Sequence, residues 1–173
     1  MEALIEFGKI LLPAGVVLYA MYLVVKMFLS KEMDKVHLDL KMKNSEVILP
    51  IRLQAYERVC LFLERITPGN LIVRLNDSSY TAAEFQHILL REIREEFNHN
   101  LSQQLYISVA SWTLVKNAME EIVMTINESA GELNQEAKAL DLGKVIIDKT
   151  VQSQQQAVDF ALQHLKEEIA EVF

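Results

Sequence analysis

The residues of this chain that could bind a metal ion are two Glu-x-x-His pairs, Glu84/His87 and Glu96/His99. Residues three apart share one face of a helix, and di-iron helical bundles use this spacing, but they take the two pairs from different helices. Here both pairs fall within one predicted helix, twelve residues apart and therefore ~18 Å apart along its axis. We attribute the spacing to chance and predict no metal site and no cofactor.

Nucleophilic catalysis also has no support in the sequence. A catalytic Ser or Cys needs a strained turn, such as Gly-x-Ser-x-Gly, with a His and an acid nearby, and the chain has no such motif. The pair Gly143–Lys144 lacks the upstream glycine of a phosphate-binding loop. The single cysteine, Cys60, lies in the apolar run VCLFL and is predicted to be an inert core residue. We predict no catalytic residue and a protein that is not an enzyme.

The elements that would position such residues are predicted to be helices. The chain has 173 residues and a net charge of −7, with only three prolines and five glycines, which disfavours a turn-rich β fold. Residues 44–173 carry eleven Lys and Arg against nineteen Asp and Glu, a net of −8. Because nucleic-acid binding requires a basic surface, this balance argues against nucleic acid as a partner.

The most apolar stretch is residues 10–29, ILLPAGVVLYAMYLVVKMFL, with the single charge Lys26. A helix of this length spans roughly 30 Å, the thickness of a bilayer's hydrocarbon core. No small-x-small cleavage site follows, so we predict a retained transmembrane helix. The predicted organisation is a tail (1–9), a transmembrane helix (10–29), a basic connector (30–48) and an acidic helical domain (49–173).

Charges on either side of residues 10–29 give this predicted helix a direction. Lysines predominate after it, which by the positive-inside rule places the C-terminal domain in the cytoplasm and the N-terminus outside. We therefore predict a single-pass membrane protein, with the lipid bilayer as a partner. The lysines predicted to lie at the membrane surface are Lys26, Lys31, Lys35, Lys41 and Lys43.

The connector, residues 30–48, has two possible structures. Alternation of Val36, Leu38, Leu40 and Met42 is typical of a strand. The 4-3-4 spacing of Leu29, Met33, Val36 and Leu40 indicates a helix instead. We favour the helix, because no partner strand is apparent elsewhere.

The remaining residues predict a bundle of four or five helices. Pro50 suits the first turn of a helix that ends near Ile66. Residues 67–76 are predicted to form a short helix capped by Thr67, or alternatively a short strand. Thr81-Ala-Ala-Glu84 is a capping box that begins a helix ending around residues 98–100.

The C-terminal helices have weaker boundary signals. Ser102 is predicted to cap a long helix that reaches about residue 127, with Trp112 in its core and Gly131 as a terminator. A final helical region, 132–173, is predicted to break at Gly143. The predicted fold class is thus all-α: a single N-terminal transmembrane helix followed by a cytoplasmic bundle.

Two stretches carry a family resemblance. They are LPIRLQAYERVCLFLERITPGNL (49–71) and REIREEFNHNLSQQLYIS (91–108), the latter continued by SWTLVKNAMEEI (111–122). The chain resembles an uncharacterised family of single-span inner-membrane proteins from Bacteroidetes bacteria. The resemblance implies a bacterial inner-membrane setting and assigns no functional residue.

The function predicted from these observations is that of a non-enzymatic helical scaffold. It would dock an unknown protein partner or its own copies at the inner membrane. The alternative is a ligand- or metal-sensing helical module, or an enzyme whose site has no recognised motif.

Overall fold

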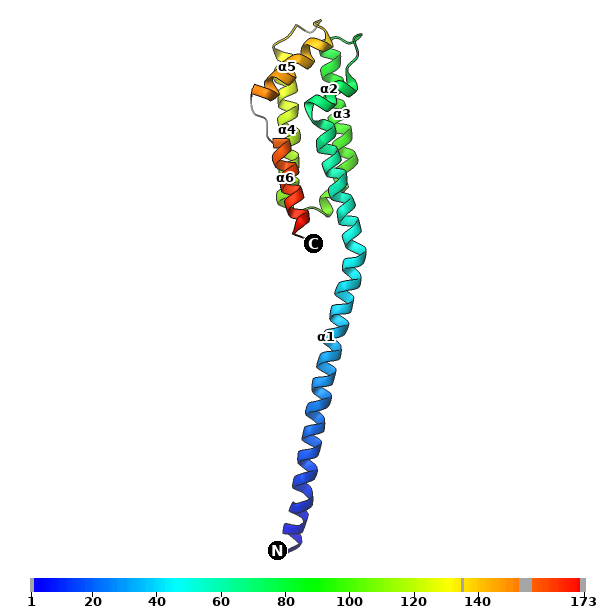
Figure 1. The fold of residues 1–173 in the computed structure, drawn as a ribbon, viewed down its shortest axis with the longest axis vertical. Coiled ribbons are helices and arrows are strands. Elements are labelled where there is room, and N and C mark those ends of the chain that lie inside the picture. The colour runs from blue at the N-terminus through cyan, green and yellow to red at the C-terminus, as the bar shows by residue number, and fades with distance from the viewer. Residues whose placement is uncertain (1, 135, 153–156, 172–173) are drawn as a thin grey trace. The chain divides into compact units, whose positions relative to one another are not determined.

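A computed structural model describes the backbone of residues 2–134, 136–152 and 157–171, and the side chains of these residues except 2–14, 41, 44 and 45. Within these ranges the protein is all-α, as predicted, with a single isolated β-bridge between Thr81 and Lys138. The elements, coloured from blue to red in Figure 1, are α1 (Glu2–Ile66), α2 (Pro68–Leu75), α3 (Ala82–Asn100), the 3₁₀ helix η1 (Leu101–Leu105), α4 (Val109–Gly131), α5 (Ala139–Gln152) and α6 (Ala157–Ala170).

The helix α1 is one continuous element of 65 residues. It includes residues 30–48, so the helical alternative for the predicted connector is correct and the strand alternative is wrong. The chain divides into two compact units, Met1–Leu49 and Pro50–Phe173, and this division falls within α1. Pro50 therefore does not begin a new helix. It lies inside α1, where its nitrogen cannot donate the usual backbone hydrogen bond.

The prediction of a single-pass inner-membrane protein is contradicted. Among the residues whose side chains the structure describes, no helix carries an apolar stretch long enough to cross a bilayer. The physical reason is charge, because from Gly15 onwards the uncharged stretch ends at Lys26, and Lys31 and Glu32 follow soon after. The predicted inner-membrane localisation is therefore overturned, and the predicted transmembrane helix has no support among these residues. The lipid bilayer as a partner stays a prediction.

Local signals correctly placed α2 and α3. Pro68 occupies the first turn of α2, where a missing N–H is least costly. The Thr67 hydroxyl does not cap α2 and instead donates to the Leu63 carbonyl at 3.0 Å. The capping box that begins α3 is present in full: the Glu84 amide donates to Thr81 Oγ1 at 3.3 Å, and the Thr81 amide donates to the Glu84 carboxylate at 2.9 Å.

The predicted start of the fourth helix at Ser102 is wrong. Residues 101–105 form η1, and α4 begins at Val109 with Ser108 as its N-cap. The Ser108 hydroxyl accepts a hydrogen bond from the Ser111 amide at 3.1 Å, which satisfies one of the donors that a helix start leaves free. The helix ends at Gly131, where the sequence predicted a terminator.

The predicted break at Gly143 is also wrong, because Gly143 lies inside α5. A Cβ atom at this position would lie 3.1 Å from Ile72 Cγ2, so the glycine permits close approach of α2 and α5. The C-terminal region is instead divided between α5 and α6, whose bounds fall at Gln152 and Ala157.

A single hydrophobic core holds the unit Pro50–Phe173 together. Apolar side chains of α1 between Tyr56 and Ile66 belong to this core, with residues of α2, α3, α4, α5 and α6. Aromatic rings link three of these helices: Phe62 lies 5.9 Å from Phe97, and Phe97 lies 5.6 Å from Trp112, measured between ring centroids. Trp112 is 9% exposed, so the prediction that it is a core residue is confirmed.

Candidate functional site

The lysines predicted at a membrane surface lie along α1. Lys26, Lys31, Lys35 and Lys43 have exposed side chains, and the side chain of Lys41 lies outside the described residues. From residue 26 to residue 43 the helix rises by ~26 Å. The lysines are therefore spread along the length of the helix and do not converge on a single binding site.

Three of the four residues in the two Glu-x-x-His pairs, Glu84, Glu96 and His99, make contacts with other residues of the chain. Glu84 belongs to the capping box of α3, and its hydrogen bonds from the Thr81 amide and hydroxyl hold the pKa of its carboxyl below the usual range. Glu96 contacts Arg65, with 3.3 Å between Oε1 and Nε. His99 Nδ1 lies 2.9 Å from the carbonyl oxygen of Glu95. In the part of the chain that the structure describes, no three His, Cys, Asp or Glu side chains are placed to hold a metal ion.

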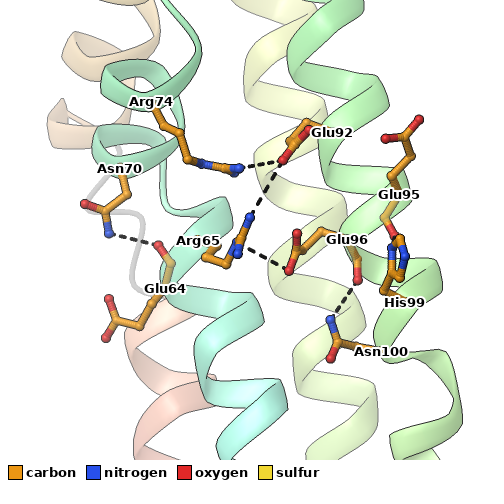
Figure 2. A network of polar contacts seen from close by, with 9 residues as sticks. All are labelled: Glu64, Arg65, Asn70, Arg74, Glu92, Glu95, Glu96, His99 and Asn100. Atoms are coloured by element: carbon orange, nitrogen blue, oxygen red, sulfur yellow. Dashed lines mark hydrogen bonds and ion pairs between the residues drawn. The ribbon is translucent and has the colours of Figure 1, made fainter.

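A charged network joins α1 and α2 to α3 (Figure 2). Arg65 Nη2 lies 4.0 Å from Glu92 Oε1, and Arg74 Nη1 lies 2.5 Å from the same oxygen. The Arg65 side chain is 50% exposed, and those of Glu92 and Glu96 are 26% and 20% exposed. Because pairs this exposed each contribute only ~0–1 kcal/mol, the network orients the three helices more than it stabilises them. No local pattern in the sequence indicates these partners.

A second polar cluster surrounds Glu168 of α6. Its Oε1 accepts a hydrogen bond from the Tyr56 hydroxyl at 2.6 Å and another from the Ser108 amide at 3.1 Å. Its Oε2 accepts from the Ser108 hydroxyl at 2.8 Å and also from the Ser111 hydroxyl. The carboxylate thus sits at the N-terminus of α4, where free amides and the helix dipole favour a negative charge.

Two further side chains complete this cluster. The Ser111 hydroxyl also lies 2.9 Å from His164 Nδ1. Arg52 donates from Nη2 to the Tyr56 hydroxyl at 3.4 Å and from Nε to the Tyr106 carbonyl at 3.3 Å. The Glu168 cluster therefore ties the C-terminal part of α1 and the start of α4 to the C-terminal helix α6.

Burial and hydrogen bonding shift the pKa of Glu168 in opposite directions. Burial raises the pKa of this carboxyl, but hydrogen bonds from Ser111, Tyr56 and Ser108 outweigh that effect and leave the pKa below its usual range. The pKa of Tyr56 is instead raised above its usual range, because burial and the hydrogen bond to Glu168 both raise the pKa of the phenol. At neutral pH the pair is therefore an anionic carboxylate and a neutral phenol that donates to it.

Ser, His and Glu meet in this cluster, but their arrangement does not suit nucleophilic catalysis. Ser111 is 0% exposed, so a substrate cannot reach its hydroxyl. Glu168 accepts directly from the serine, whereas in a catalytic triad the acid orients the histidine. The geometry is that of a structural clamp among three helices.

The Glu168 cluster could not have been predicted from the sequence, because Tyr56 and Glu168 are 112 positions apart. One weak signal was available. Leu165 and Ile169 are apolar residues at helical spacing in the last helical region. Glu168 lies beside these residues, where a charged residue needs a partner.

The lone cysteine is half-buried in the described bundle. Burial raises the pKa of the Cys60 thiol, Glu64 adds to this effect, and Lys166 opposes it. A raised pKa disfavours the nucleophilic thiolate, as expected for an inert core residue.

One of the concavities of the bundle has a volume of about 170 Å³. Its lining includes Thr67, Pro68, Ile122, Glu121 and Asp159. The volume is below the ~300–1,000 Å³ typical of small-molecule sites. The carboxylates of Glu121 and Asp159 in its lining do not by themselves indicate a particular ligand.

Comparison with known proteins gives one match. Residues 2–172 match a protein family described as a family of unknown function, DUF7935. The chain belongs to this family. The match spans the whole described helical region, so α1 and the bundle are both part of the DUF7935 sequence, but it carries no statement about Bacteroidetes or about a membrane span. No curated protein and no solved structure matches the chain.

Proposed function

We propose that this protein is a non-enzymatic association module, which uses α1 to bind other protein chains or its own copies. The observation that carries the proposal is the exposure of apolar side chains on α1. From Val16 to Leu29, twelve large hydrophobic residues are 43–68% exposed. Monomeric proteins rarely expose contiguous apolar patches larger than a few hundred Å², and larger ones mark interaction sites.

The arrangement of the bundle supports a structural role for residues 50–173. Its polar side chains make long-range contacts within the bundle: Arg65 pairs with Glu96, and the Tyr56 hydroxyl donates to Glu168. Ser111, the hydroxyl closest in type to a nucleophile, is enclosed. These contacts hold the helices in place, which is what a module that presents a binding surface requires.

Site-specific photo-crosslinking in cells tests the proposal. A crosslinking amino acid replaces Leu18, Val25 or Leu38 of α1 in the full-length chain, and in control variants it replaces Val73 or Val109, which are 82% and 85% exposed. We expect protein adducts from the α1 positions and few from the controls. Equal or absent crosslinking at both sets of positions would contradict the proposal.

A further inference from the structure

The exposed apolar residues of α1 cover the whole circumference of the helix. Large hydrophobic side chains occupy positions 16–19, 21–25 and 27–29 almost without interruption. Because successive residues in a helix are rotated by ~100°, such a run points in every direction. A helix that is hydrophobic all round is normally buried on all sides.

The size of this surface can be compared with what a stable interface needs. A large apolar side chain has roughly 60–120 Å² to bury, so twelve of them at their observed exposure offer on the order of 400–900 Å² per chain. A standard protein interface uses ~800 Å² from each partner. The surface is therefore large enough for a specific interface, provided that most of it is covered.

A single neighbouring helix cannot cover it. In a two-stranded coiled coil only the a and d positions, two of every seven, face the partner. Most of the side chains between Val16 and Leu29 would then remain in contact with water. Packing among three or more helices also covers the flanking positions, as in a helical bundle.

The charges that follow this run make α1 complementary to itself. Residues 30–43 carry Lys31, Lys35, Lys41 and Lys43 together with Glu32, Asp34 and Asp39, four positive charges against three negative ones. A partner that was strongly acidic or strongly basic would meet like charges, whereas another α1 offers both signs in nearly equal numbers. Residues 44–173, which include the bundle, have by contrast a net charge of −8 and would repel their own copies.

A row of exposed apolar residues, here called the seam, extends this surface along α1. Leu29, Met33 and Val36 recur at 4-3 spacing with Leu40, and all are 51–64% exposed. Since α1 is unbroken, this seam continues directly from the apolar run, so residues 15–40 provide nearly four heptads of one helix.

We infer that α1 assembles with α1 of other copies of this chain, in a bundle of at least three helices formed by residues 15–40. This inference rests on the proposed association function and names its partner. In the assembly, Val16–Leu29 supply the shared apolar core and the mixed charges of residues 30–43 flank it. The unit Pro50–Phe173 contributes no residue to that core.

Sedimentation equilibrium of the purified full-length chain over a wide range of concentration tests this inference. The expected mass is at least three times the 19.8 kDa of one chain. The double variant Leu18→Glu/Val25→Glu, with both positions on one face of α1, should sediment as a single chain. The control variant Val73→Glu/Val109→Glu places the same charges on exposed valines of the bundle and should leave the mass unchanged.

Three results would overturn the inference. They are a wild-type chain that is monomeric or only dimeric, an assembly that survives Leu18→Glu/Val25→Glu, and a single copy of α1 taken up by phosphatidylcholine vesicles. Circular dichroism of each variant checks that the bundle remains folded. If the chain is monomeric but α1 crosslinks to a different protein, the association function stands and self-assembly fails. If α1 crosslinks to nothing, both fail.

Discussion

At the scale of single residues, Glu168 is the most connected polar group that the structure describes. It accepts hydrogen bonds from Tyr56, Ser108 and Ser111, which come from two other helical segments. Hydrogen bonds to a charged group contribute ~1.5–3 kcal/mol each in mutational series, although such values are not additive. A single carboxylate therefore fixes how α6 meets α1 and α4.

Replacing this carboxylate should weaken the fold at neutral pH. We expect Glu168→Gln to lower the free energy of unfolding by about 1–3 kcal/mol, because the amide keeps the shape but loses the charge. Chemical denaturation followed by circular dichroism measures the change. Glu167→Gln, at the exposed neighbouring position, is the matched control and should have little effect.

The lowered pKa of Glu168 predicts how stability depends on pH. A carboxyl whose pKa is lower in the folded protein stabilises the fold above its unfolded pKa of about 4.3. This stabilisation is lost as the pH falls through the lower folded pKa. Glu168→Gln should therefore lose less stability between neutral and acidic pH than the wild type. An identical acid dependence in the two proteins would show that Glu168 is not stabilised as an anion.

Cys60 allows a test of burial by chemical modification. Because burial raises the pKa of its thiol, a maleimide or disulfide reagent should label Cys60 slowly at neutral pH. Unfolding in denaturant should make labelling fast. The ratio of the two rates, followed by mass spectrometry, is the measurement, and fast labelling of the folded protein would contradict the structure.

At the scale of elements, α4 has Ser108 as its N-cap and not Ser102, the cap predicted from the sequence. Ser108 caps the helix and also donates to Glu168, whereas Ser102 is an exposed residue of η1. We expect Ser108→Ala to destabilise the fold by about 0.5–2 kcal/mol, the usual loss for an N-cap. Ser102→Ala should be nearly neutral. A larger loss for Ser102→Ala in thermal or chemical unfolding would restore the helix start predicted from the sequence.

The contact of α5 with α2 depends on Gly143. We expect Gly143→Leu to destabilise the fold, because the new side chain would clash with Ile72. Helix propensity cannot explain such a loss, since leucine favours helices more than glycine does. Overpacking of this kind typically costs about 1–3 kcal/mol. Gly69→Ala is the control, because a Cβ there meets nothing within 4 Å. It should be neutral or stabilising by up to about 1 kcal/mol.

At the scale of the whole molecule, the hydrophobic core of the described side chains consists of residues from the unit Pro50–Phe173. We expect a fragment of residues 50–173 to unfold in a single cooperative transition, because α1 contributes to the core only from Ala55 onwards. Thermal denaturation followed by circular dichroism measures this. A fragment without a cooperative transition would mean that residues 1–49 are needed for folding.

Several elements were predictable because their signals are local. The capping box of α3, the proline in the first turn of α2 and the glycine at the end of α4 each involve residues within one turn of the boundary that they mark. For residues 30–48 periodicity allowed a strand or a helix, and the lack of an apparent partner strand correctly favoured the helix. The error at Ser102 has a physical cause, since Ser102 and Ser108 both suit an N-cap and only the turn after η1 selects between them.

The sequence alone determined the all-α class, the capping box of α3 and the burial of Trp112, because these follow from interactions between near neighbours and from apolar periodicity. Only the tertiary structure showed that Arg65 pairs with Glu96 and that Tyr56 and Ser108 bind Glu168. The reason is distance along the chain: a polar side chain far from its partner has no local pattern that records the pairing, and packing of the helices brings the two together.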